Sequence, residues 1–294
     1  MMKKKPMLAY PVSDKPIDYS KPTFIQPKLD GVRCVIQANV KRHVLHPSLN
    51  QVDIKAYSRT GKEWKNIDHI LERLMPFFVK KDFANADVIL DGELYNHDLK
   101  DNFEKIISLV RKTKPTDEDR QEAAELTQFH CYDTIMEHMP FDKRMDFINK
   151  SLTPSSSICI VDTILMPTEV QAKDCHQDNL NQGYEGSIVR TNGTYHCNRS
   201  HNLRKFKDFH DNEAMILDWV EGKGKRVGTI GKFIAQDSEG NIFGMPVMDK
   251  FEYLQGNFEE MKTWVGKFAT FTYFERTKAG SYRHPLFKAI RDYE

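Results

Sequence analysis

Apolar and polar positions alternate through the first 60 residues, in extended runs that turn signals interrupt. The runs "FIQPK" and "VRCVIQANV" stand on either side of Asp30-Gly31, and "AYSRTG" follows. An Asp-Gly pair between two strand-like runs is a strong indicator of a β-hairpin. The pattern therefore predicts a hairpin with Lys28 near the end of one strand and Arg33 near the start of the next. Both side chains would then meet over one pocket.

From residue 64 to residue 192 the apolar spacing changes repeatedly between helical and extended. Apolar residues three and four positions apart predict helices, with Asn66 capping the first and Gly183 ending the last. Short apolar runs between them predict strands. The predicted helices are 64–78, 101–113, 116–127, 142–152 and 168–183. The predicted strands are 86–96, 129–135, 157–167 and 185–192.

The composition changes near residues 208 to 213, beyond which β-rich runs are short and punctuated by glycine. Five or so short strands with one helix-like insert, 250–265, suit a small barrel of the OB type. We therefore expect an α+β chain: residues 1–208 with antiparallel sheets and helices, and residues 209–294 as an all-β OB-fold domain. The predicted strands of the second domain include 214–220, 228–237, 241–247 and 267–276.

The composition gives no sign of a membrane or secreted protein. Hydrophobic residues make up 39% of the chain, and apolar runs such as "IISLV" are far shorter than the ~20 residues that span a bilayer. The start "MMKKKPMLAYPVS" is basic but has no sustained apolar stretch, so it is a poor signal peptide. The five cysteines form no CxxC pair, and the histidines and cysteines of 175–201 match no standard zinc spacing. We expect a cytoplasmic protein that does not contact a membrane.

The net charge of +1 does not indicate a nucleic-acid partner, but the distribution of charge is uneven. From Met261 to Arg291 there are seven basic residues and one acidic residue. This basic tail is a candidate phosphate-binding patch. On the count alone, an ordinary solvated strand surface is slightly favoured.

Lys28 has neighbours in the sequence that would suit a nucleophilic lysine. An unperturbed lysine has a pKa of ~10.4 and is almost fully charged at pH 7, so a reactive one needs its pKa lowered. Burial and nearby cations lower it. Arg33 is one such cation, and Lys205 and Lys207 are two more, since residues two apart in a strand face the same way. The alternative for these two lysines is a solvated edge strand.

Two carboxylates stand in strand-like apolar runs, where an unpaired charge is costly to bury. They are Glu93 in "LDGELY" and Glu185 in "YEGSIVR". Carboxylates of this kind suit Mg²⁺, which commonly bridges a protein carboxylate and a substrate phosphate. A lysine, several cations, two carboxylates and a divalent metal describe a phosphoryl or nucleotidyl transfer site. The patterns GxxxxGK[ST], HExxH and GxSxG are absent, which removes the main support for P-loop ATPases, zincins and serine hydrolases.

Six short segments resemble, in order, the motifs of the covalent nucleotidyltransferases. This superfamily contains ATP-dependent DNA ligases, RNA ligases and mRNA capping enzymes. The segments are "KLDGVR", "SRTGK", "LDGELY", "CYDTI", "EGSIVR" and "LRKFK". Together with the C-terminal region, the resemblance covers almost the entire chain, and it implies that residues 1–208 are an adenylation (nucleotidyltransferase) domain.

The resemblance implies how ATP would be held. Lys28 would attack the α-phosphate of ATP and carry AMP as a phosphoramidate. Gln26 would lie beside the adenine, and Tyr132 would stack on it. Lys205 and Lys207 would neutralise the α-phosphate, where charge develops during the transfer.

The resemblance also implies which residues would contact the metal and the DNA. Arg33 would contact the ribose side or the nick phosphates, and Arg59 would contact the 5'-phosphate. Glu93 would bind the ribose hydroxyl or the metal, and Glu185 would bind the metal.

The C-terminal region resembles the OB domain of ATP-dependent DNA ligases and ends like small bacteriophage ligases. Arg283 and Arg291 are the candidates for the last motif, which would orient the ATP pyrophosphate, and no plain RxDK pattern chooses between them. Only 27 residues precede Lys28, so we expect a minimal ligase that grips DNA with its own two domains. The basic tail and "GKGKR" would contact phosphates.

We therefore expect an ATP-dependent DNA ligase that seals nicks in duplex DNA with ATP and Mg²⁺. It would act as a monomer in the cytoplasm, or in the host cytoplasm if a phage encodes it. An RNA ligase or an mRNA capping guanylyltransferase shares the lysine chemistry and is the enzymatic alternative. A non-catalytic OB-fold protein that binds nucleic acid is the alternative of another class, but it leaves Lys28 and the carboxylates unexplained.

Overall fold

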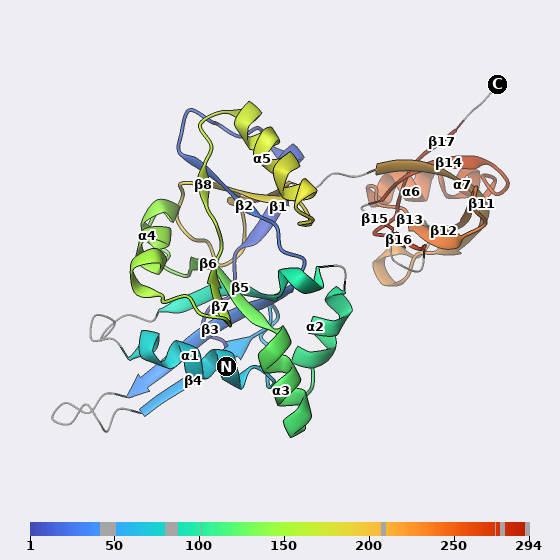
Figure 1. Ribbon diagram of the computed structural model, residues 1–294. Coiled ribbons are helices and arrows are strands. Elements are labelled where there is room, and N and C mark those ends of the chain that lie inside the picture. The colour runs from blue at the N-terminus through green and yellow to red at the C-terminus, as the bar shows by residue number, and fades with distance from the viewer. Residues whose placement is uncertain are drawn as a thin grey trace. The chain divides into compact units, whose positions relative to one another are not determined.

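A computed structural model describes residues 1–41, 51–79, 88–100, 102–206, 210–273, 275–276 and 280–291. The chain divides into two units, Met1–Phe206 and Lys207–Glu294 (Figure 1). The fold class is α+β with mostly antiparallel sheets, which confirms the prediction. In the described part of the chain, no helix is both long enough and apolar enough to cross a membrane.

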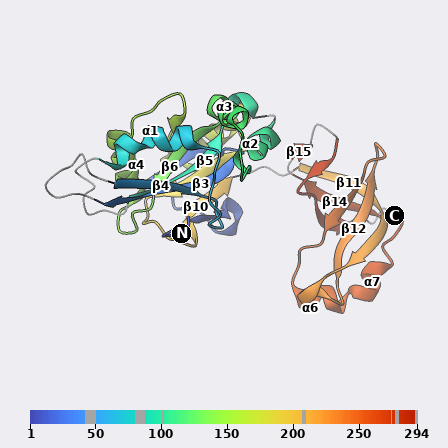
Figure 2. The same ribbon diagram turned by 90° about the horizontal axis from the view of Figure 1, so that it is seen from below.

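Two five-stranded sheets pack against each other in the first unit (Figures 1 and 2). Their strand orders are β1-β10-β9-β2-β8 and β4-β3-β5-β6-β7. The first contains β1 (Leu8–Pro11), β2 (Thr23–Pro27), β8 (Ile164–Leu165), β9 (Ser187–Thr191) and β10 (Arg199–Phe206). The second contains β3 (Val32–Lys41), β4 (Gln51–Tyr57), β5 (Ile89–Tyr95), β6 (Gln128–Thr134) and β7 (Ile158–Ile160).

Helices cover the outer sides of these sheets. Apolar side chains of α1, α2 and α4 share one core with the sheet that contains β3 and β5, and α3 packs on α1 and α2. Ala172 of α5 packs on Ile25 and Val189 of the other sheet. The helices are α1 (Asp68–Phe78), α2 (Phe103–Val110), α3 (Asp117–Leu126), α4 (Phe141–Ser151) and α5 (Glu169–Asn181), with short 3-10 helices at Val12–Asp14 and His97–Leu99.

The two-residue period of the strands decides which side chains face the other sheet. In β3, Ile36 packs toward the helices, whereas Val35 packs between the two sheets. In β5, Leu90 packs toward the helices and Ile89 packs between the sheets. Polar residues that lie an even number of positions from Val35 in β3, or from Ile89 in β5, therefore face the space between the sheets.

The predicted hairpin around Asp30-Gly31 is wrong, because β2 and β3 belong to different sheets. β2 pairs with β8 and β9, whereas β3 pairs with β4 and β5. The chain between them crosses from one sheet to the other, and the main-chain N–H of Lys28 donates to the carbonyl of Gly186 at 2.9 Å. The crossing still brings Lys28 and Arg33 to one cavity, which was the expected consequence.

Two smaller predictions for this unit are also wrong. Asn66 does not cap α1; its side-chain amide donates to the carbonyl oxygens of Leu109 and Asp119, at 3.1 Å each. The predicted strand 157–167 is divided into β7 and β8, which lie in different sheets. The other predicted helices and strands are confirmed to within a few residues, and β1 was not predicted.

The second unit is a strongly curved sheet with two short helices (Figure 2). Its strand order is β13-β12-β11-β14-β17, and the edge strands β13 and β17 approach each other, as the OB-type barrel requires. Phe233 and Phe271 lie in its core. The strands are β11 (His210–Glu221), β12 (Ile230–Asp237), β13 (Ile242–Pro246), β14 (Phe268–Tyr273), β15 (Glu275–Arg276), β16 (Tyr282–Arg283) and β17 (Leu286–Ile290). The helices are α6 (Phe251–Gly256) and α7 (Phe258–Lys262), with a 3-10 helix at Gly224–Arg226.

Gly31 is needed for a close approach between segments and not for a turn. Its φ is not positive, and a Cβ there would lie 2.5 Å from the carbonyl oxygen of Leu94 and 2.6 Å from Cγ of Glu93. We predict that Gly31→Ala lowers the free energy of unfolding by about 1 to 3 kcal/mol, measured by urea denaturation, because of overpacking. Gly256→Ala is the control, since a Cβ at Gly256 meets nothing within 4 Å. Equal effects of the two substitutions would contradict this explanation.

Candidate active site

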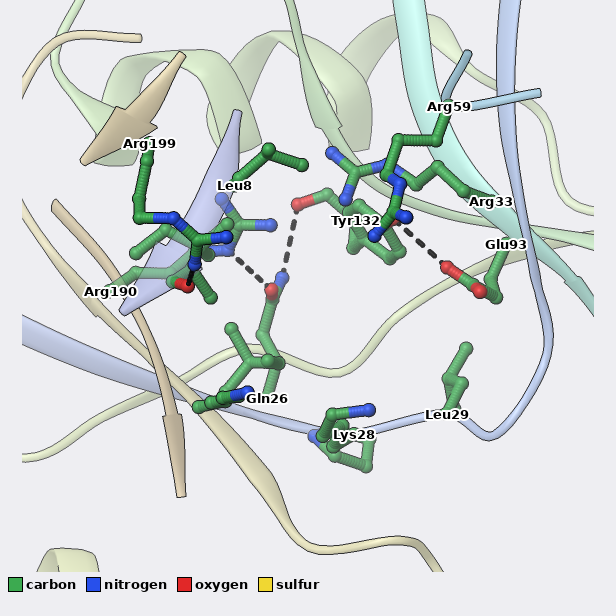
Figure 3. A pocket seen from close by; sticks show the side chains of 15 residues that line it. Leu8, Gln26, Lys28, Leu29, Arg33, Arg59, Glu93, Tyr132, Arg190 and Arg199 are labelled. Atoms are coloured by element: carbon green, nitrogen blue, oxygen red, sulfur yellow. Dashed lines mark hydrogen bonds between the residues drawn. The ribbon is translucent and has the colours of Figure 1, made fainter. Parts of the chain in front are cut away.

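A cavity of about 290 Å³ in the first unit collects most of the predicted site residues (Figure 3). It is lined by strands of both sheets and by the segment between β2 and β3. The predicted residues that line it are Gln26, Lys28, Arg33, Arg59, Glu93, Tyr132 and Lys205. Residues separated by more than 170 positions in the chain thus meet at one place.

Lys28 follows the last residue of β2, and its ammonium group pairs with the Glu185 carboxylate. Their side chains are 20% and 7% exposed. The main-chain N–H of Glu185 also donates to the carbonyl of Lys28 at 3.0 Å, which fixes the two segments together. Burial, followed by the charges of Lys28 and Arg199, lowers the pKa of Lys205. Three cations therefore stand close enough to influence one another.

Arg33 is held by a carboxylate that the sequence analysis did not single out. Its Nε and Nη2 donate to Oδ1 and Oδ2 of Asp91 at 2.7 and 2.5 Å. Burial acts to lower the pKa of Arg33, but Asp91, Tyr132 and Tyr195 together outweigh it and raise that pKa well above the ordinary value. The charge of Arg33 is therefore balanced by Asp91, which weakens the expectation that Arg33 makes the Lys28 amine more reactive.

Glu93 lies on the same face of β5 as Asp91 and is half-buried at the cavity. Tyr132 donates its hydroxyl hydrogen to Oε2 of Glu93 at 3.1 Å. Burial raises the pKa of Glu93 to about 7, against the lowering effect of Arg33 and Lys28. Near neutral pH this carboxyl group is thus close to its midpoint of ionisation.

Gln26 is 1% exposed, and its amide is held by three neighbours. Oε1 accepts from Nε of Arg190 at 2.6 Å, and Nε2 donates to the carbonyl oxygen of Tyr132 at 3.1 Å and to Oγ1 of Thr163 at 2.8 Å. Arg33 and Arg190 place their guanidinium carbons 5.2 and 5.4 Å from the centroid of the Tyr132 ring. The two residues predicted to face adenine are therefore rigidly positioned.

The sequence between residues 6 and 207 matches the family model of the ATP dependent DNA ligase domain. The match covers more than half of the chain. The protein belongs to the ATP-dependent DNA ligase family. It is an enzyme, a ligase that uses ATP, and the RNA ligase, capping and non-catalytic alternatives are not favoured.

Solved structures of other ligases share the fold of this ligase. A Lig E DNA ligase, described as binding DNA with a minimal scaffold, is 21% identical with a TM-score of 0.73, over 99% of this chain and 100% of its own. A structure named Pmar-Lig_Pre is 20% identical with a TM-score of 0.76, over 99% and 68%. The ligase of bacteriophage T7 in complex with ATP is 16% identical with a TM-score of 0.53, over 98% of both chains. None of the curated proteins matches the sequence significantly.

Arg59 is exposed at the cavity of the ligase, as Arg199 is, whereas the other residues that line the cavity are at least partly buried. It lies in a turn after β4 that two main-chain hydrogen bonds close, from Ser58 to Lys62 at 2.7 Å and from Gly61 to Ser58 at 2.9 Å. The exposed guanidinium is thus available to a molecule outside the cavity as well as inside it.

Three of the predicted residues that the structure describes, Glu185, Arg283 and Arg291, are not among those that line this cavity. Glu185 adjoins it through its pair with Lys28. Lys207 lies outside the described residues. Arg283 and Arg291 belong to the second unit of the ligase. Arg291 donates from Nε to Oγ1 of Thr270 at 3.0 Å and pairs through Nη2 with Glu213 at 2.5 Å. The choice between these two arginines for the last motif stays open.

The basic tail of the ligase is largely neutralised by carboxylates of its own domain. The pairs are Lys262 with Glu259, Arg276 with Glu239 and Asp237, Lys288 with Asp211, and Arg291 with Glu213. The acidic partners precede the tail in the sequence, so a count within 261–291 overlooks them. Four of the seven basic residues of the tail therefore have acidic partners in the described chain, which favours the solvated strand surface over a phosphate-binding patch. Lys278 lies outside the described residues.

Sequence reasoning missed Arg190 and Arg199, which also line the cavity. Arg190 stands in the apolar strand "SIVRT" and is 2% exposed. Glu93 and Glu185 were singled out because each is a charged residue inside an apolar strand. Arg190 meets the same criterion and could have been identified in the same way. Arg199 begins β10 in a polar stretch, and no local signal marks it.

Glu93 and Glu185 are carboxylates of the kind that can share a magnesium ion with substrate phosphates. The described residues contain no group of three or more His, Cys, Asp or Glu side chains placed to hold a metal by themselves. Mg²⁺ in phosphate chemistry is commonly bound by one or two carboxylates, with waters and phosphate oxygens completing its shell. Glu93 at the cavity and Glu185 on Lys28 supply carboxylates of that kind.

The raised pKa of Glu93 predicts a pH-dependent stability. The folded ligase keeps the Glu93 proton up to about pH 7, whereas the unfolded chain releases it near the ordinary value of 4.5. The contribution of Glu93 to stability is therefore lost as pH rises between those values. We predict that Glu93→Gln matches the wild type at pH 4.5 and is more stable at pH 8 by on the order of 2 to 3 kcal/mol, measured by urea denaturation. A difference that does not change with pH would contradict the assignment.

Proposed function

We propose that this ligase seals 5'-phosphate/3'-hydroxyl nicks in duplex DNA through a covalent Lys28-AMP intermediate. The observation that carries the proposal is the position of Lys28. It stands at the cavity beside Lys205, Arg199 and Glu93, within the segment that the family model matches. A lysine among cations and carboxylates suits attack on a phosphate, because the cations stabilise charge that develops on phosphoryl oxygens.

In the first step the neutral amine of Lys28 attacks the α-phosphorus of ATP. A P–N bond forms, the bond from the α-phosphorus to the bridging oxygen breaks, and pyrophosphate leaves. Lys28 must first give up the proton that its pairing with Glu185 stabilises. Repulsion between the charges of Lys28 and Lys205 favours that loss. Gln26 and Tyr132 hold the adenine, and Arg283 or Arg291 orients the pyrophosphate.

In the second step an oxygen of the 5'-phosphate at the nick attacks the α-phosphorus of the adenylate. The P–N bond breaks, and Lys28 regains a proton. In the third step the 3'-hydroxyl oxygen attacks the 5'-phosphorus, its proton is released, and AMP leaves. Arg59 and Arg33 hold the 5'-phosphate, and the exposure of Arg59 suits a contact with DNA outside the cavity.

Glu93 and Glu185 would hold Mg²⁺ in this scheme, and Lys205 and Lys207 would neutralise the α-phosphate. When bound, the ion would neutralise phosphate charge during the transfer. Competition between the metal and Lys28 for Glu185 would also release the ammonium group from its ion pair. Glu93 favours its ionised form once a cation is close.

The second unit would grip the DNA backbone through "GKGKR" more than through the tail. Lys223 and Lys225 are exposed, beside and within the 3-10 helix Gly224–Arg226. Phosphate contacts of this kind give affinity without sequence preference. We propose that the ligase acts as a monomer on nicked DNA, in the cytoplasm or in that of a host.

Lys28→Ala should abolish the covalent adduct. We predict no detectable labelled protein after incubation with ATP labelled at the α-phosphate and magnesium, because the acceptor nitrogen is gone. Lys150→Ala, on the exposed face of α4, is the matched control and should label like the wild type. An undiminished adduct in Lys28→Ala would exclude Lys28 as the acceptor.

Arg59→Ala should impair nick sealing while leaving adduct formation at Lys28 largely intact. We predict adduct formation within about threefold of the wild type, and nick sealing at least about tenfold slower, because a charged hydrogen bond to the DNA phosphate is lost. The measurement is sealing of a labelled nicked duplex by ligase that already carries AMP. Equal losses in adduct formation and in sealing would place Arg59 in the ATP site.

A further inference from the structure

The amide of Gln26 has one orientation that its neighbours impose. Arg190 can only donate, so the atom that it contacts at 2.6 Å must be the oxygen Oε1. The carbonyl of Tyr132 can only accept, so the atom facing it at 3.1 Å must be Nε2. Figure 3 shows the Gln26 amide between these two residues, with both contacts drawn. Both contacts require the same orientation of the amide and hold it there.

This orientation leaves an acceptor and no donor. Both hydrogens of Nε2 are used, by the carbonyl of Tyr132 and by Oγ1 of Thr163. A carbonyl oxygen has two lone pairs, and Arg190 takes one of those on Oε1. Gln26 lines the cavity, so a molecule bound there meets a hydrogen-bond acceptor at this position.

We propose that Arg190 is a positioning residue that sets the base preference of the ligase by holding Gln26 in this acceptor-only orientation. A base with an exocyclic amino group, such as adenine, can donate to the free lone pair of Oε1. A base with a carbonyl at the same position would place a second acceptor against Oε1, and the oxygen of the base would find no donor there. This inference rests on the proposed function, in which the base of the nucleotide lies at Gln26.

Arg190 is itself fixed by a buried carboxylate. Asp133 is 0% exposed and accepts from Nη1 of Arg190 at 2.6 Å. It also accepts from Nε and Nη2 of Arg144 at 2.7 and 3.1 Å. Both guanidinium groups lie near the ring of Phe141, at 4.8 Å for Arg190 and 5.4 Å for Arg144.

Arg144 therefore offers a matched control. It shares Asp133 and Phe141 with Arg190 and is equally buried. Its remaining hydrogen bonds go to the carbonyl oxygens of Met139 and Gly193, and not to Gln26. Removing either arginine removes one partner of Asp133, but only the loss of Arg190 also removes one of the three contacts that hold the Gln26 amide.

The test compares ATP with inosine triphosphate, in which a carbonyl replaces the amino group of adenine. The rate of covalent adduct formation at Lys28 is measured over a range of each nucleotide, and the ratio of kcat/KM values is taken. We expect the preference for ATP to fall about tenfold in Arg190→Met, the equivalent of one discriminating hydrogen bond. We expect Arg144→Met to keep the wild-type ratio, although thermal unfolding should show both variants destabilised.

Two results of this comparison would contradict the role proposed for Arg190. An unchanged ratio in folded Arg190→Met, or an equal fall in Arg144→Met, would overturn the proposal. If Arg190→Met does not fold, Gln26→Leu replaces it, because it removes the acceptor and leaves Arg190 on Asp133. A full preference for ATP in Gln26→Leu would then overturn it. Failure of the wild type to form any adduct with either nucleotide would refute the proposed function instead.

Discussion

Carboxylates buried between the two sheets hold the first unit together. Asp133 of β6 accepts hydrogen bonds from Arg190 of β9 in the opposite sheet and from Arg144 of α4. Asp91 of β5 binds Arg33 of β3 and the hydroxyl of Tyr195, at 2.5 Å for the latter. Breaking such a pair from one side costs about 3 to 5 kcal/mol, because a charge is left buried without a partner. The observed packing of the two sheets gives each of these carboxylates its hydrogen-bond donors.

The same ion pairs form the walls of the cavity. Arg33 and Arg190 each use a carboxylate to stay in place and present the rest of their surface to Tyr132 and Gln26. The strand period puts these residues on the inner faces of the sheets, where they meet across the cavity. Groups that reach reacting phosphates in the proposed scheme, such as Lys28 and Arg59, lie at strand ends and turns. In the proposed scheme, rigid ion pairs would position the base, and residues at strand ends and turns would carry out the chemistry.

Local patterns in the sequence predicted most of the elements and most of the cavity. Helical spacing found α1 to α5, and the six ordered motifs found seven of the residues that line the cavity. The errors arose where tertiary pairing decides the outcome. Asp30-Gly31 has the composition of a hairpin turn, but the flanking strands find better partners in separate sheets, and Gly31 serves a close approach instead. The basic tail has few acidic neighbours in sequence but several in space. Arg190 could have been found as a charge inside an apolar strand, but its partners could not, because Asp133 and Gln26 are 57 and 164 positions away.

The central claim is that the amine of Lys28 carries AMP, and the most direct test is to locate the modified residue. The ligase is incubated with ATP and magnesium without DNA, digested under conditions that preserve a phosphoramidate, and analysed by mass spectrometry. We expect one adenylyl group, on the peptide that contains Lys28, which disappears when pyrophosphate or nicked DNA is added. An adenylyl group on the peptide that contains Lys205, or a stable adduct that neither addition removes, would contradict it.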